Sequence, residues 1–139
     1  MKHIEKIVIK GTSGYCPADC AYNDKVTLTS DSISYEYKPY EESASNPIRK
    51  WSYKTNSLIF RNEFCEIAGF IPMALNLGPE EMCMDIGSTE FNITFSDKTK
   101  YKHEYFVSSD CFEDLFRMIK KLVPSTECVP EVLRTEEDY

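Results

Sequence analysis

Apolar and polar residues alternate along several stretches of the chain. A period of two residues is typical of β-strands that bury one face and expose the other. In the clearest example, Ile33, Tyr35 and Tyr37 alternate with Ser34 and Glu36. The same pattern predicts strands over residues 4–9, 26–29, 33–37, 50–54, 84–86, 91–95 and 101–107. We therefore expect about seven strands.

Two other stretches repeat their apolar residues at helical spacing, which predicts amphipathic helices with one buried face. The first apolar face consists of Phe60, Phe64, Ile67, Ala68 and Ile71. The second consists of Phe112, Leu115, Phe116, Ile119, Leu122 and Val123. Asn56 or Ser57 can cap the first helix. Proline interrupts helices, so Pro72 and Pro124 are expected to end the two helices.

The predicted elements follow the same order in the two halves of the chain. Residues 25–72 and residues 83–124 both give strands followed by a helix, and Tyr53, Phe60 and Pro72 align with Tyr105, Phe112 and Pro124 at one constant spacing. We interpret the halves as two β-β-β-α units of a single α+β domain spanning residues 1–139, with a tail over residues 125–139. The two units would share an antiparallel sheet with both helices on its apolar face.

The opposite face of this sheet is expected to be polar and mixed in charge. The residues placed there by alternation are Ser34, Glu36, Lys50, Ser52, Lys54, Asn92, Thr94, Lys102 and Glu104. Such a face is usually in contact with solvent, and its use as a docking surface is the less common case.

Composition narrows the classes of function. The chain has 139 residues, 16 basic and 23 acidic side chains and a net charge of −7, with a pI near 4.9. Nucleic-acid binding requires clustered positive charge, so this balance argues against a nucleic-acid partner. No apolar stretch resembles a signal peptide or a membrane span, which predicts a cytoplasmic protein with no membrane partner. A chain from which an export signal had been removed would look the same.

The number of cysteines, six, is the unusual feature of the composition. Reduced thiols are normal in the cytoplasm, and Cys65, Cys83 and Cys111 are expected to be buried as small hydrophobic residues. Cys16 and Cys20 lie in the segment Gly11–Cys20, outside the repeat. The favoured interpretation of this segment is a turn between two strands. The alternative is a metal or thiol site at Cys16 and Cys20, which needs further ligands such as Cys83, Cys128 or His3.

No catalytic motif emerges from the sequence. His3 and His103 are the only histidines, and the alignment of His103 with Trp51 predicts a buried core histidine. No cofactor motif is present either, so no cofactor is expected. An enzyme that uses a pocket beside the Gly11–Cys20 segment is a further alternative.

Several stretches resemble an uncharacterised family of small bacterial proteins. They are residues 32–39, 49–55, 118–124 and 133–139. The resemblance covers most of the chain and implies an independent bacterial domain. It implies no catalytic or binding residues.

The leading hypothesis is a cytoplasmic, non-catalytic interaction or ligand-binding module, whose partner is a protein or a small molecule. Aromatic residues on the strands motivate it, because aromatic rings exposed at an edge or groove favour partner contacts. They are Tyr35, Tyr37, Tyr40, Trp51 and Tyr53. The alternative is the metal- or thiol-dependent protein that uses Cys16 and Cys20. Open sheet edges also permit homodimerisation.

Overall fold

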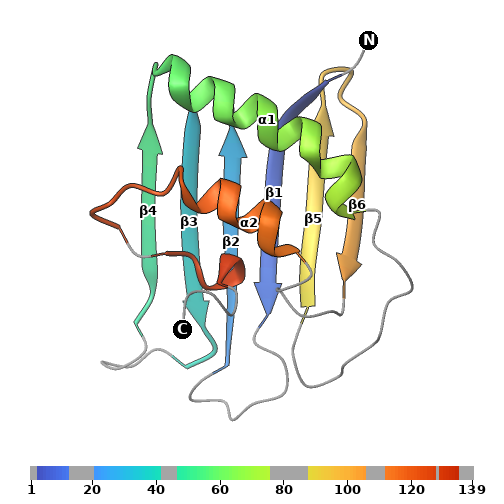
Figure 1. Cartoon of the computed structure of the whole chain (residues 1–139). Helices are drawn as coiled ribbons and strands as arrows, with labels where there is room; N and C mark the ends of the chain where they lie inside the picture. The colour runs from blue at the N-terminus through green and yellow to red at the C-terminus, as the bar shows by residue number, and fades with distance from the viewer. Residues whose placement is uncertain are drawn as a thin grey trace.

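Two α-helices lie on one face of a single antiparallel sheet in the computed structural model of the chain (Figure 1). The structure describes residues 3–12, 21–41, 47–75, 88–105, 112–127 and 129–134. Within these residues the sheet has six strands in the order β4-β3-β2-β1-β5-β6. The strands are β1 (Ile4–Thr12), β2 (Tyr22–Thr29), β3 (Ser32–Pro39), β4 (Arg49–Lys54), β5 (Ser88–Phe95) and β6 (Lys100–Tyr105). The helices are α1 (Leu58–Leu75), α2 (Glu113–Lys120) and the short 3-10 helix η2 (Glu131–Leu133).

The alternation in the sequence becomes the two faces of this sheet. Ile7 of β1 lies opposite Leu28 of β2 and Ile93 of β5, and all three side chains are buried. Directly opposite residues in an antiparallel pair point to the same face, so the apolar residues of the six strands, with the exception of Val8 in β1, face the helices. Phe60, Phe64 and Ile67 of α1, and Leu115, Phe116 and Ile119 of α2, complete the core.

The first helix is longer than predicted. Its amino end is capped by Ser57, whose Oγ accepts a hydrogen bond from the Phe60 N–H at 3.4 Å, as expected for an N-cap. Pro72 lies inside the helix, so the prediction that it ends α1 was wrong. Proline lacks an N–H and so removes one bond, to the carbonyl four residues earlier. Because Pro72 is near the end of α1, the residues after it remain helical.

The α+β class and the placement of two helices on one face are confirmed, whereas seven strands and two β-β-β-α units are not. The predicted strand 84–86 lies outside the described residues. In addition, β1 pairs with β5 along the edge that a hairpin partner from 84–86 would occupy. The first strand extends to Thr12, so Gly11 and Thr12 belong to β1 and not to the loop predicted for Gly11–Cys20.

The turn between β5 and β6 contains a residue with a left-handed backbone. Lys98 has φ of 70°, and its N–H donates to the Phe95 carbonyl at 2.9 Å. A side chain other than glycine costs about 1 kcal/mol or more in this conformation. Its ammonium group forms an exposed ion pair with Glu5 at 3.0 Å, and exposed pairs contribute little.

Replacing Lys98 by glycine therefore tests the turn. We expect Lys98→Gly to raise the free energy of unfolding by about 0.5–1 kcal/mol, because the gain from relieved strain exceeds the lost ion pair. Urea denaturation measures the change. The control Lys100→Gly, at the start of β6, should lower stability instead; equal losses for both variants would contradict the assignment of strain to Lys98.

Candidate functional site

One buried carboxylate interrupts the apolar face of the sheet. Asp24 of β2 lies opposite Gly11 of β1 and Tyr37 of β3, and its side chain points toward η2 with only 4% of the residue exposed. Its Oδ2 accepts a hydrogen bond from the Tyr35 hydroxyl at 2.9 Å and another from the Val132 N–H at 2.8 Å. The Tyr35 oxygen in turn accepts the Glu131 N–H at 3.2 Å. Asp24 and Tyr35 thus hold the start of η2 against the sheet.

Charge and aromatic contacts reinforce the same attachment. The guanidinium of Arg49 lies 4.1 Å from the centre of the Tyr37 ring and 3.7 Å from the Glu131 carboxylate. Tyr37 also stacks on Tyr22, with ring centres 5.0 Å apart. These contacts join β2, β3 and β4 to the last described residues of the chain. They attach η2 to the sheet beside Asp24, whose Oδ2 is hydrogen-bonded to Val132 and Tyr35.

Burial raises the pKa of Asp24 to about 6, although the hydrogen bonds from Val132 and Tyr35 act in the opposite direction. The other carboxylate oxygen, Oδ1, is buried and has no hydrogen-bond partner among the described residues. Burial also raises the pKa of the Tyr35 hydroxyl, which keeps its proton and remains a donor. The proton on Asp24 is therefore held by the folded chain at a pH at which the unfolded chain has released it.

This difference makes stability depend on pH. The folded state binds more protons than the unfolded state between about pH 4 and pH 6, so stability falls as the pH rises through this window. The free energy of unfolding falls by about 3 kcal/mol, which is the energy equivalent of the rise in the pKa of Asp24.

Replacing Asp24 by asparagine tests this dependence on pH. Asn resembles the protonated carboxyl but does not titrate, so Asp24→Asn should remove the contribution of this carboxyl to the pH dependence of stability. We expect wild type to lose about that much stability relative to the variant between pH 4 and pH 7 in urea unfolding; parallel curves would contradict it.

Gly11 makes room for the carboxylate. A Cβ atom at this position would lie 2.6 Å from Asp24 Oδ1 and 2.7 Å from a methyl carbon of Val132. Both neighbours are buried, so neither has free space into which to move.

The variant Gly11→Ala should lower the free energy of unfolding by about 1–3 kcal/mol, measured by thermal or urea unfolding. The control Gly69→Ala, where an added Cβ meets nothing within 4 Å, should be neutral or stabilising because Gly69 lies in α1; an equal loss at both sites would refute the contact.

The opposite face of the sheet, here called the open face, carries a different set of side chains. It comprises the strand residues that point away from α1 and α2, and no described element covers it. Its charged residues are Lys6, Lys10, Lys25, Lys38, Lys50, Lys54, Lys100, Lys102, Glu36, Glu90 and Glu104. All eight lysines are exposed. The open face thus has an excess of five positive charges.

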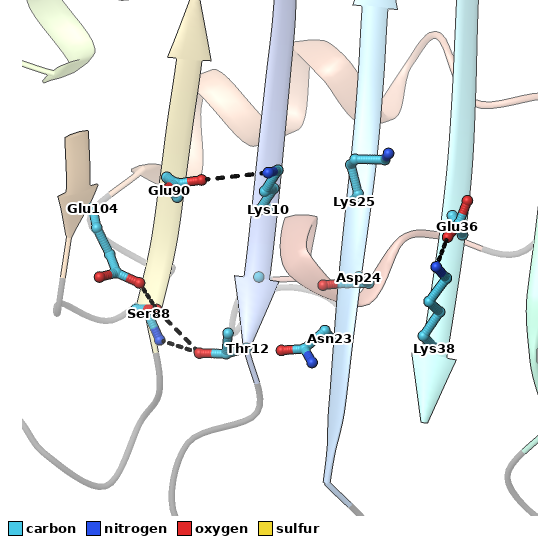
Figure 2. Close-up of a pocket in the computed structure, with 11 residues that line it drawn as sticks. Lys10, Thr12, Asn23, Asp24, Lys25, Glu36, Lys38, Ser88, Glu90 and Glu104 are labelled. Carbon is cyan, nitrogen blue, oxygen red and sulfur yellow. Dashed lines mark hydrogen bonds and ion pairs between the residues drawn. The ribbon is translucent and has the colours of Figure 1, made fainter. Parts of the chain in front are cut away.

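A shallow cup of about 280 Å³ lies at one end of the open face, where β1 ends and β5 begins (Figure 2). Ser88 Oγ donates to Glu104 at 2.7 Å, and the Ser88 N–H donates to Thr12 Oγ1 at 3.0 Å. Lys10 lies 3.8 Å from Glu90 across the strands. These contacts involve five of the ten polar side chains that line the cup.

Ion pairs neutralise only part of the lysine set. Lys38 donates to Glu36 at 2.8 Å, and this hydrogen bond lowers the pKa of Glu36 and raises that of Lys38. Glu90 forms ion pairs with both Lys10 and Lys102, and its distance to the Lys102 ammonium is 3.6 Å. The remaining lysines of the open face form no ion pair within the described part of the chain. They are Lys6, Lys25, Lys50, Lys54 and Lys100.

Charge is therefore segregated in the fold. The open face holds eight of the twelve lysines, none of the four arginines and three of the 23 acidic residues. The described residues off the open face hold seven basic and eleven acidic side chains. The open face is therefore positively charged, although the net charge of the whole chain is −7.

The residues proposed from the sequence as a metal site lie outside the described residues. This applies to both Cys16 and Cys20, and also to Cys83, Cys111 and Cys128. Cys65 is exposed on α1, so the prediction that it is buried was wrong; it occupies the solvent side of the helix. Among the described residues no group of three or more His, Cys, Asp or Glu side chains could hold a metal ion.

The aromatic and histidine predictions had mixed outcomes. Tyr35, Tyr37 and Trp51 are buried under the helices, which removes them as contact residues, whereas Tyr40 and Tyr53 are 75% and 43% exposed. His103 lies opposite Phe91 on the helix-facing side of β6. It is nevertheless exposed because β6 is an edge strand, so the prediction of a core histidine was wrong.

Two features of the site were absent from the sequence predictions. Asp24 has the same phase as Val26 and Leu28, and extending their alternation by one step would have placed it on the apolar face. The lysines of β1 alternate with Ile7 and Ile9 in the same way. The alternation of residues along β1 and β2 could therefore have predicted the face on which Asp24 and these lysines lie.

Comparisons with known proteins identify no relative: no family model, curated protein or solved structure matches the chain. Within the described residues, no helix is both long enough and apolar enough to cross a membrane.

Proposed function

We propose that the protein is a non-catalytic interaction module that binds its partner through the open face of its sheet. One observation carries the proposal: exposed lysines, five of them without an ion pair among the described residues, gather on the one sheet face that the helices leave free. The compartment we propose is the cytoplasm, as predicted from the sequence.

Lysine on an edge strand discourages pairing with other chains, which accounts for the lysines of β4 and β6 but not for those of the interior strands. Any polar residue keeps the outer side of a strand in water, and lysine is depleted in strands relative to threonine and other β-formers. Lys10 and Lys25 even lie directly opposite each other, where like charges are destabilising. An oppositely charged partner would turn this repulsion into a favourable interaction.

A binding role fits the chemistry of the open face better than catalysis. The Ser88 hydroxyl donates to Glu104, but neither histidine accompanies this pair. His103 is on the covered face of β6, and His3 precedes β1, whose other end reaches Ser88. The open face therefore offers charge and hydroxyl donors with no activated nucleophile among the described residues.

Lysine labelling in cells tests this proposal without knowledge of the partner. A membrane-permeable amine acylating reagent would be applied to cells that make the protein at its native level, and to the purified protein. We expect Lys6, Lys54 and Lys100 to be several-fold less labelled in cells, because the partner covers them. Lys98 and Lys121, which lie off the open face, should react equally in both samples. Equal labelling of every lysine in both samples would overturn the proposal.

A further inference from the structure

Half of the open face has no acidic side chain on its strands. Two adjacent cross-strand rows, here called the acid-free rows, make up this half. One row is Lys54, Ser32, Thr29, Lys6, Thr94 and Lys100, and the other is Ser52, Ser34, Thr27, Val8, Asn92 and Lys102. They combine four lysines with six hydroxyl groups. Asp31, in the turn after β2, marks their margin and accepts a hydrogen bond from Thr29 at 3.0 Å.

We infer that the partner of the open face is a short acidic polypeptide segment that lies across the acid-free rows. This inference rests on the function proposed above and names the chemistry of the partner. Lysine ammonium groups attract carboxylates, and serine and threonine hydroxyls donate to carboxylates and to backbone carbonyls. The lysines of these rows lie on the two edge strands, β4 and β6, and on the interior strand β1.

The size of the acid-free rows favours a short segment. Neighbouring strands are about 4.8 Å apart, so six strands span about 24 Å, and an extended chain at about 3.4 Å per residue crosses them in about seven residues. The next row contains Glu36, Glu90 and Glu104. A partner whose negative charge extends along the strands as well as across them would also lie over these carboxylates, which would repel it.

The side chains of the open face favour a polypeptide over a nucleic acid. None of the strand positions that form it is aromatic, so unpaired bases have no ring on which to stack. None is arginine, the residue whose planar group binds phosphate through two parallel hydrogen bonds. The eleven acidic residues described off the open face would also oppose the approach of an extended polyanion.

An anionic membrane fits the open face less well for a related reason. Peripheral membrane binding combines basic residues with apolar or aromatic side chains that enter the lipid boundary. Val8 is the single apolar residue in the acid-free rows. It lies in the interior strand β1 and is half-buried. The acid-free rows therefore offer charge and hydrogen bonds without an apolar anchor.

Binding of a fluorescein-labelled octaglutamate peptide, followed by fluorescence anisotropy on the full chain, tests the inference. The test variant is Lys6→Glu with Lys100→Glu, at two exposed lysines without ion pairs in the described residues. The control is Arg61→Glu with Lys121→Glu, which changes the net charge equally at exposed positions off the open face. We expect the test variant to bind about tenfold more weakly or worse, and the control to change by less than about twofold.

A neutral pair of substitutions guards against loss of folding. Lys6→Gln with Lys100→Gln keeps the strands polar, and its binding should be intermediate between wild type and the reversed variant. Circular dichroism melting of every variant shows that each is folded. Equal weakening in the test and control variants, or no binding of octaglutamate by wild type, would overturn the inference.

Two further probes separate the nature of the partner from the proposed function. Single-stranded and duplex oligonucleotides, and vesicles of phosphatidylserine and phosphatidylcholine, are measured with the same variants. If one of these binds more tightly than octaglutamate and loses binding in the Lys6 and Lys100 variant, the acidic-polypeptide inference is wrong and the open face remains the binding surface. Equal lysine labelling in cells and in purified protein would count against the proposed function itself.

Discussion

The core and the open face of this protein depend on one geometric constraint: the six strands pair so that directly opposite residues share a face. Ile7, Leu28 and Ile93 meet on one side of this register, and Lys6, Thr29 and Thr94 meet on the other. A shift of any strand by one residue would exchange its faces, placing charged side chains against α1 and α2. The cost of burying unpaired charge fixes the register, and the register in turn gathers the lysines.

Asp24 is the one charged group that the register places on the covered face of the central strands. It is tolerated there because Tyr35 and Val132 donate to it and Gly11 leaves space for it. The attachment closes the end of the core with Val132 and Leu133, both buried. The raised pKa of this carboxyl is thus explained by its burial at the end of the core.

The sequence predicted most of the local structure but neither the helix ends nor the arrangement of the strands: Pro72 lies inside α1, and α2 ends at Lys120, before Pro124. Alternation predicted the strands around Ile33 and Phe91, and helical spacing predicted both helices, because these signals lie within a few residues of each other. The position of β1 between β2 and β5 could not be predicted, since strand pairing depends on contacts distant along the chain. The bond between Asp24 and Val132 spans 108 residues and left no local signal.

The same limit explains why the open face was predicted as merely mixed in charge. Alternation correctly placed Lys50, Lys54 and Lys102 on it, together with Glu36 and Glu104. Lys6 and Lys100 have the same phase, and the pairing of β1 with β5 and of β5 with β6 brings them into one row with Thr94 between them. A chain with a net charge of −7 thereby presents a positive surface that its composition conceals.

The central claim is that an acidic partner contacts the open face at its acid-free rows. The most direct measurement is two-dimensional NMR of the lysine side-chain signals during titration with octaglutamate. The signals of Lys6, Lys54, Lys100 and Lys102 should move together and saturate, while those of Lys98 and Lys121 remain in place. Movement of all lysine signals to the same extent, or movement confined to Lys98 and Lys121, would contradict this account.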